Sequence, residues 1–115
     1  MLSNDILNYE RILETAEGDE EFKQDLILAL QDSLTELKET YQKGIASYDL
    51  ILLKQARHKI KPTLQLFEMN QLKNALDESK QITETHEQSS EVVKKSLEDV
   101  LRCCDEVLAV IQQNA

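Results

Sequence analysis

The chain has 115 residues and a formal net charge of −9 at pH 7. This length suffices for one domain with a single core, and the acidic surface argues against nucleic acid or an anionic membrane as the main partner. We find no long apolar span and no N-terminal secretory segment, so we expect a cytoplasmic protein. Two Gly, one Pro and no Trp among many Leu, Glu, Lys and Gln residues predict an all-α fold for a single domain over residues 1–115.

A short first helix is predicted near the N-terminus. Ile6, Tyr9 and Leu13 mark one face of it, between a candidate cap at Ser3 and a stop signal at Gly18.

Asp19 is a suitable N-cap for a long second helix, which we expect to end at Gly44. Its apolar positions recur every three or four residues, at Phe22, Leu26, Leu30, Leu34, Leu37 and Tyr41.

Three more helices are expected in the second half of the chain. The third begins near Ser47 or Asp49 and runs to about Phe67, and the fourth resumes after a break at residues 68–70. A polar loop lies within residues 83–90, before a last helix whose apolar positions are Val93, Leu97, Val100, Cys104, Val107 and Ile111. Long amphipathic helices with short connections predict an up-down four-helix bundle, with the short N-terminal helix in addition. The alternative is a helical hairpin that buries its apolar stripe against a second copy; the chain length favours the closed bundle, and we expect a monomer.

The third helix carries a histidine that the helical period places in solvent. With about 100° per residue and Ile60 at the centre of the buried face, His58 lies about 160° away. It is therefore not expected in the core. The same outer face carries Ile51, Lys54, Gln55, Lys61, Pro62 and Gln65.

The segment around His58 is basic in an acidic protein. Residues 54–61 hold four cations and no acid, which are Lys54, Arg57, Lys59 and Lys61. Such a patch could receive a phosphoryl group or dock on an acidic pocket, and Lys61 lies one turn beyond His58. Charge and periodicity alone favour a plainer interpretation, a solvated basic stripe that helps the helix to dock.

The spacing of residues around His58 resembles the phosphorylation helix of histidine-phosphotransfer (HPt) domains. Ala56, His58, Ile60, Lys61 and Thr63 match the pattern of that family. The apolar turn that follows the helix is similar as well, at Phe67, Met69 and Leu72, and so is the layout of the long helix that begins after Gly18.

This resemblance implies that His58 accepts a phosphoryl group through Nε2 and that Lys61 stabilises its charge. The donor would be a phospho-aspartate on a receiver domain, often of a hybrid sensor kinase, and the acceptor would be an aspartate of another receiver. The chain would need no cofactor and would have no nucleotide-dependent activity, because the Mg²⁺ site lies on the receiver. The residues expected to contact a receiver are Ile51, Lys54, Gln55, Arg57, Lys59, Pro62 and Gln65.

Pro62 departs from the family pattern, which usually has Gly at this position. Proline lacks a backbone N–H, and its ring presses on the carbonyl four residues back, which belongs to His58. We therefore expect a slight bend in the third helix.

Two other classes of function compete with a phosphorelay. One is a helical adaptor that binds receivers or other signalling proteins without carrying phosphate, and the other is a coiled-coil scaffold, against which Gly18 and Gly44 argue. His86 has acidic neighbours and is expected to be an ordinary surface histidine, and the residues around the two histidines lack the Glu-x-x-His spacing of a di-metal site. The adjacent Cys103 and Cys104 form neither a disulfide framework nor a metal-ligand spacing, so we expect them to fill the core.

Overall fold

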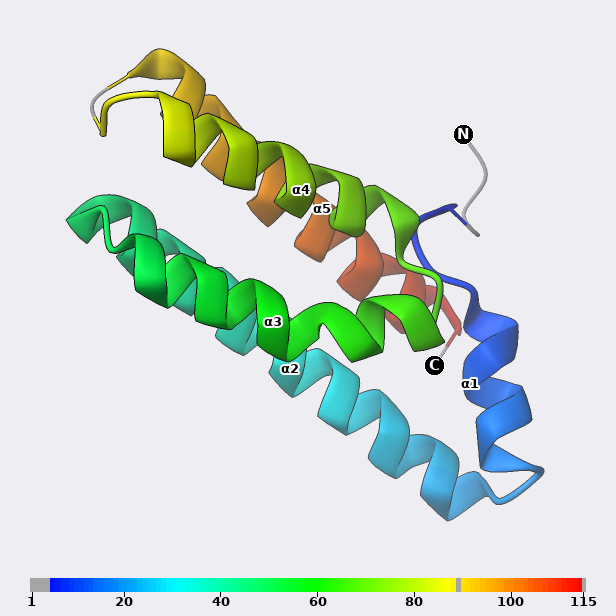
Figure 1. Ribbon diagram of the computed structural model, residues 1–115. Coiled ribbons are helices and arrows are strands. Elements are labelled where there is room, and N and C mark those ends of the chain that lie inside the picture. Colours follow the sequence, from blue (N-terminus) through cyan, green and yellow to red (C-terminus); the bar gives the residue numbers. More distant parts are fainter. Residues whose placement is uncertain (1–4, 89, 115) are drawn as a thin grey trace.

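The computed structural model describes residues 5–88 and 90–114, and this part of the chain is all-helical without a strand (Figure 1). Its helices are α1 (Tyr9–Ala16), α2 (Glu20–Ser47), α3 (Leu50–Leu66), α4 (Asn70–Thr85) and α5 (Glu91–Asn114). The all-α prediction is confirmed, and the breaks before α4 and α5 fall where the sequence predicts them. None of the described helices is apolar and long enough to cross a membrane.

Aspartate side chains begin α2 and α3. Asp19 Oδ1 accepts a hydrogen bond from the backbone N–H of Phe22 at 3.0 Å, and Asp49 Oδ1 accepts one from Leu52 at the same distance. Each satisfies a backbone donor that the first turn of a helix leaves without a partner. Asp49 thereby sets the start of α3.

Gly44 does not end α2, contrary to the sequence-based expectation. The helix continues to Ser47 and stops at Tyr48, whose backbone is left-handed with φ of 49°. Gly44 is buried where α2 meets α3, and a Cβ atom there would lie 2.5 Å from Leu53 Cδ2. The glycine therefore allows α2 and α3 to approach each other closely. The local sequence does not distinguish a glycine in such a contact from a glycine that ends a helix.

The N-terminal helix α1 is shorter than expected. Its buried face is rotated about the helix axis by about one residue from the predicted face. It begins at Tyr9 and buries Ile12 and Ala16, whereas Leu13 is 39% exposed. The candidate cap Ser3 lies outside the described residues. Phe22, placed on the buried face by its spacing, is also exposed.

Each long helix lies against two other long helices. α3 packs between α2 and α4, α5 lies against both α2 and α4, and α1 packs on the first half of α2 (Figure 1). The core is mainly apolar, and its largest fully buried side chains include Leu34, Tyr41, Leu53, Met69, Leu72, Val100 and Ile111. This packing leaves one face of α3 free, with a flank toward α2 and a flank toward α4.

Hydrogen bonds from loops hold both ends of the assembly. At one end the Asn8 N–H donates to the Phe67 carbonyl at 2.9 Å, and Arg11 Nε contacts Glu68 Oε2 at 3.0 Å. At the other end Tyr48, between α2 and α3, donates its hydroxyl to the Thr83 carbonyl at 2.7 Å. The connections on either side of α3 are thus tied to the rest of the fold.

Candidate functional site

His58 lies on the solvent face of α3, as its helical position predicts. Leu53, Ala56, Ile60 and Leu64 form the buried face of the same helix. His58 is exposed, and so are Lys54 and Lys61, one turn before it and one turn after it. The imidazole can therefore be reached by another protein.

A hollow of about 170 Å³ opens between α3 and α4 at His58. We call it the basic hollow; it is lined by Lys54, Arg57, His58, Lys61, Leu64, Gln65, Lys73, Leu76, Asp77 and Lys80. Its lining thus carries five cations and one acid. In a chain with a net charge of −9, this is a local reversal of sign.

Most of the positive charge in the basic hollow has no acidic partner. Lys73 Nζ contacts Asp77 Oδ2 at 3.0 Å, an ion pair one turn apart on α4. No ion pair within the described residues involves the other four cations of the hollow, which are Lys54, Arg57, Lys61 and Lys80. An anion that enters the hollow would meet charges that are not already neutralised.

Lys73 and Lys80 were not identified from the sequence. The basic segment of residues 54–61 lies on α3 alone, and nothing local to α4 shows which of its faces meets α3. The spacing held a partial signal, because Lys73, Asp77 and Lys80 recur at four and then three residues and so share one helix face. Only the packing of α4 beside α3 brings that face to His58.

Arg57 differs from the lysines of the basic hollow because it is half-buried and hydrogen-bonded from inside the protein. Its Nη1 donates to the hydroxyl oxygen of Tyr41 at 3.1 Å. Tyr41 is fully buried, and its own hydroxyl donates to Ser79 Oγ at 2.9 Å. Arg57 was expected to contact a receiver, and it lies at the border between surface and core.

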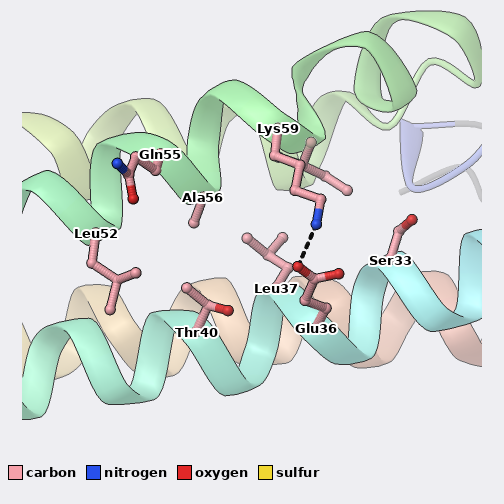
Figure 2. A pocket seen from close by; sticks show the side chains of 9 residues that line it. Ser33, Glu36, Leu37, Thr40, Leu52, Gln55, Ala56 and Lys59 are labelled. Carbon is pink, nitrogen blue, oxygen red and sulfur yellow. Dashed lines mark hydrogen bonds and ion pairs between the residues drawn. The ribbon is translucent and has the colours of Figure 1, made fainter.

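The other flank of α3 has a different character (Figure 2). A hollow of about 230 Å³ lies between α2 and α3, and we call it the α2-side hollow; it is lined by Ser33, Glu36, Leu37, Thr40, Leu52, Gln55, Ala56, Lys59 and Ile60. Across it, Lys59 Nζ contacts Glu36 Oε1 at 2.5 Å. The cations of residues 54–61 are therefore divided between the two flanks of α3. Lys59, the cation on the flank facing α2, is paired with an acid.

The remaining residues expected to contact a partner lie on the exposed face of α3. Ile51 is 71% exposed, and Gln55, Pro62 and Gln65 are exposed as well. α3 continues through Pro62 for another turn to Leu66. The expected bend at this proline stays a prediction.

His86 lies in a different environment from His58. It caps the C-terminus of α4 and is exposed, and its Nδ1 lies 3.1 Å from the Ile82 carbonyl and 2.9 Å from Thr85 Oγ1. One ring nitrogen is thus engaged locally, and the residue lines none of the hollows described above.

The two cysteines are buried on α5, as the sequence analysis predicts. Burial raises the pKa of the Cys104 thiol to about 12, and burial also raises the pKa of Cys103. Both side chains are therefore protonated thiols at neutral pH, which are weak nucleophiles. No group of three or more His, Cys, Asp or Glu residues in the described part of the chain is arranged to hold a metal ion.

Comparisons of the chain with protein-family models, with curated proteins and with solved structures find no match. The function therefore has to be argued from the two flanks of α3 and the histidine between them.

Proposed function

We propose that the protein is a phosphorelay intermediate that accepts a phosphoryl group on His58 and passes it to another protein. The observation that carries this proposal is the exposed His58 at the edge of a hollow whose cations are mostly unpaired. The donor is an aspartyl phosphate on a receiver domain, and the recipient is the aspartate of a second receiver, as in the HPt family that the α3 sequence resembles.

The chemistry requires a neutral nucleophile and compensation of negative charge. A ring nitrogen of His58 attacks phosphorus, the P–O bond to the receiver aspartate breaks, and the carboxylate leaves with the bonding electron pair. The reverse reaction with the second receiver restores the histidine. Lys61 lies one turn beyond His58 and supplies positive charge to the phosphoryl oxygens.

The basic hollow supports docking on an acidic surface. Receiver domains hold the phosphorylated aspartate in an acidic pocket with Mg²⁺, so the cations around His58 complement that pocket. We propose that Lys54, Gln55, Arg57, Lys59, Pro62 and Gln65 contact the receiver around His58, and that Ile51 adds an apolar contact. Catalysis then consists mainly of placing the imidazole in line with the phosphoryl group.

The fold proposed with this function is an up-down four-helix bundle of α2 to α5, with α1 as the additional short helix. The protein would act in the cytoplasm as a monomer, with no nucleotide and no cofactor of its own.

A second candidate function is a receiver-binding adaptor that carries no phosphate. The α2-side hollow and the 71% exposed Ile51 favour it, because they offer a contact surface that does not involve the imidazole. The two candidates differ in one property, which is covalent phosphate on the chain.

The deciding experiment mixes the purified chain with receiver domains that have been phosphorylated with radiolabelled acetyl phosphate. We expect acid-labile, alkali-stable label on the chain and none on His58→Gln. His86→Gln is the matched control, since it removes an exposed histidine outside the basic hollow, and it should be labelled like the wild type. Label that persists in His58→Gln would refute the acceptor, and receiver binding without any label would favour the adaptor.

A further inference from the structure

A buried tyrosine lies directly behind the basic hollow. Tyr41 on α2 is fully buried, and its hydroxyl is hydrogen-bonded to Arg57 on α3 and to Ser79 on α4. One phenol therefore connects the two helices that form the walls of the hollow with the helix behind them. A buried tyrosine hydroxyl needs a hydrogen-bond partner. The hydrogen bond that the Tyr41 hydroxyl donates to Ser79 already meets this need, so the contact with Arg57 is additional.

The hydrogen bond from Arg57 changes what that guanidinium can do. Its partner is a neutral hydroxyl, and no acid within the described residues pairs with it, so the positive charge is held in place without being neutralised. Arginine carries several N–H groups in a planar fork, and only Nη1 is engaged by Tyr41. The others remain available to an anion in the hollow, which Arg57 lines together with His58.

Three of the four lysines of the basic hollow have no comparable support. Lys54, Lys61 and Lys80 are exposed, and none of them takes part in an ion pair of the described residues. A flexible lysine must lose side-chain freedom when it binds an anion, whereas an arginine already held in position loses less.

We propose that Arg57 is the pre-positioned cation for a phosphoryl group on His58, and that Tyr41 is the positioning residue that holds it there. This inference rests on the proposed function, since it names further residues of the same site. Tyr41 touches no phosphate itself; it acts through Arg57.

The test uses two small probes, so that it does not depend on the identity of a receiver. Inorganic phosphate is titrated while the NMR signals of the His58 ring are followed, and phosphoramidate is used to phosphorylate His58 with release of ammonia. Tyr41→Phe should weaken phosphate binding and slow phosphorylation by about threefold to tenfold, as expected when one charge-assisted contact loses its fixed geometry.

The matched control is Tyr48→Phe, which removes a tyrosine hydroxyl that is hydrogen-bonded to the Thr83 carbonyl, away from the hollow. Both variants should lower the melting temperature by a few degrees, but Tyr48→Phe should change phosphate binding by less than about twofold. Equal effects of the two variants on phosphate binding would mean that Tyr41 is merely structural.

A double-mutant cycle separates positioning from stability. Arg57→Gln should weaken phosphate binding at least as much as Tyr41→Phe, and in that background Tyr41→Phe should add almost nothing to the loss. If Arg57→Gln binds phosphate like the wild type, the proposal is overturned. This test remains decisive even if Tyr41→Phe fails to fold. Failure of the proposed function looks different: receivers would leave no label on His58, while the phosphate titration would still report on Arg57 and Tyr41.

Discussion

The two flanks of α3 start from the same basic segment of sequence and end with different electrostatics. On the α2 side, Lys59 is paired with Glu36 over a hollow that is lined partly by apolar side chains. On the α4 side, Lys61 is joined by Lys73 and Lys80, and a single acid faces the five cations. The comparison teaches that the charge of a helix face depends on what its neighbours add to it. One flank is suited to packing and docking, and the other to holding an anion.

The largest expected effect comes from the packing on the α2 side. Leu53→Ala removes a fully buried side chain that lies over Gly44, and it should lower the free energy of unfolding by about 2–5 kcal/mol. Urea unfolding followed by circular dichroism measures this loss. His58→Ala, at an exposed position of the same helix, should change it by less than about 0.5 kcal/mol. Similar losses for both would mean that the buried face of α3 is misassigned.

The next effect concerns function and compares one lysine from each flank. Lys61→Ala should slow phosphoryl transfer to His58 about fivefold to tenfold, equivalent to roughly 1 kcal/mol of activation free energy, with little change in melting temperature. Lys59→Ala removes the same charge. With phosphoramidate as the donor for both variants, so that contact with a receiver plays no part, it should slow phosphorylation of His58 less than about twofold, because Lys59 is paired across the other hollow. Rapid-quench measurement of labelled protein gives both rates. Equal slowing would show that overall charge matters and the flank does not.

Gly44→Ala tests the close approach of α2 and α3. The added methyl would meet Leu53, and overpacking costs about 1–3 kcal/mol, whereas the gain in helix propensity returns up to about 1 kcal/mol. We expect a net loss of stability on the order of 1 kcal/mol in the wild-type background. In Leu53→Ala the space is open, so the same substitution should be neutral or stabilising. An unchanged loss in both backgrounds would contradict the steric explanation.

The smallest effect is expected from Glu36→Gln, which removes the acid of the α2-side hollow. The ion pair with Lys59 is exposed, with more than half of each side chain accessible, and such pairs contribute only about 0–1 kcal/mol. Thermal melting should therefore shift by no more than a few degrees. Transfer to His58 should remain near the wild-type rate, and a strong acceleration would show that Glu36 also weakens the basic hollow.

Much of the fold could be predicted from local patterns. The helical period placed His58 in solvent opposite Ile60 in the core, because a helix that buries one face must expose the opposite one. Capping chemistry located the start of α2 at Asp19. These features depend on residues a few positions apart, and such information is present in the sequence.

The sequence-based predictions were wrong where segments that are distant in the chain contact each other. Glycine is a residue type that often follows the end of a helix, but Gly44 lies inside α2, where it contacts Leu53 on the next helix. On α1 the sequence pattern placed Leu13 on the buried face, whereas packing on α2 buries Ile12 and Ala16 and leaves Leu13 39% exposed. In both cases the deciding contact lies on another helix.

By itself the sequence determined an all-helical chain, the bounds of most of its helices and an exposed histidine in a basic segment. Only the tertiary structure decided that α4 brings Lys73 and Lys80 to that histidine, that α2 pairs Lys59 with Glu36, and that Tyr41 holds Arg57 from inside. The physical reason is the distance along the chain over which each kind of interaction acts. Helix formation and amphipathic period act within one turn or two, whereas the charge and shape of a hollow are sums over side chains from separate helices.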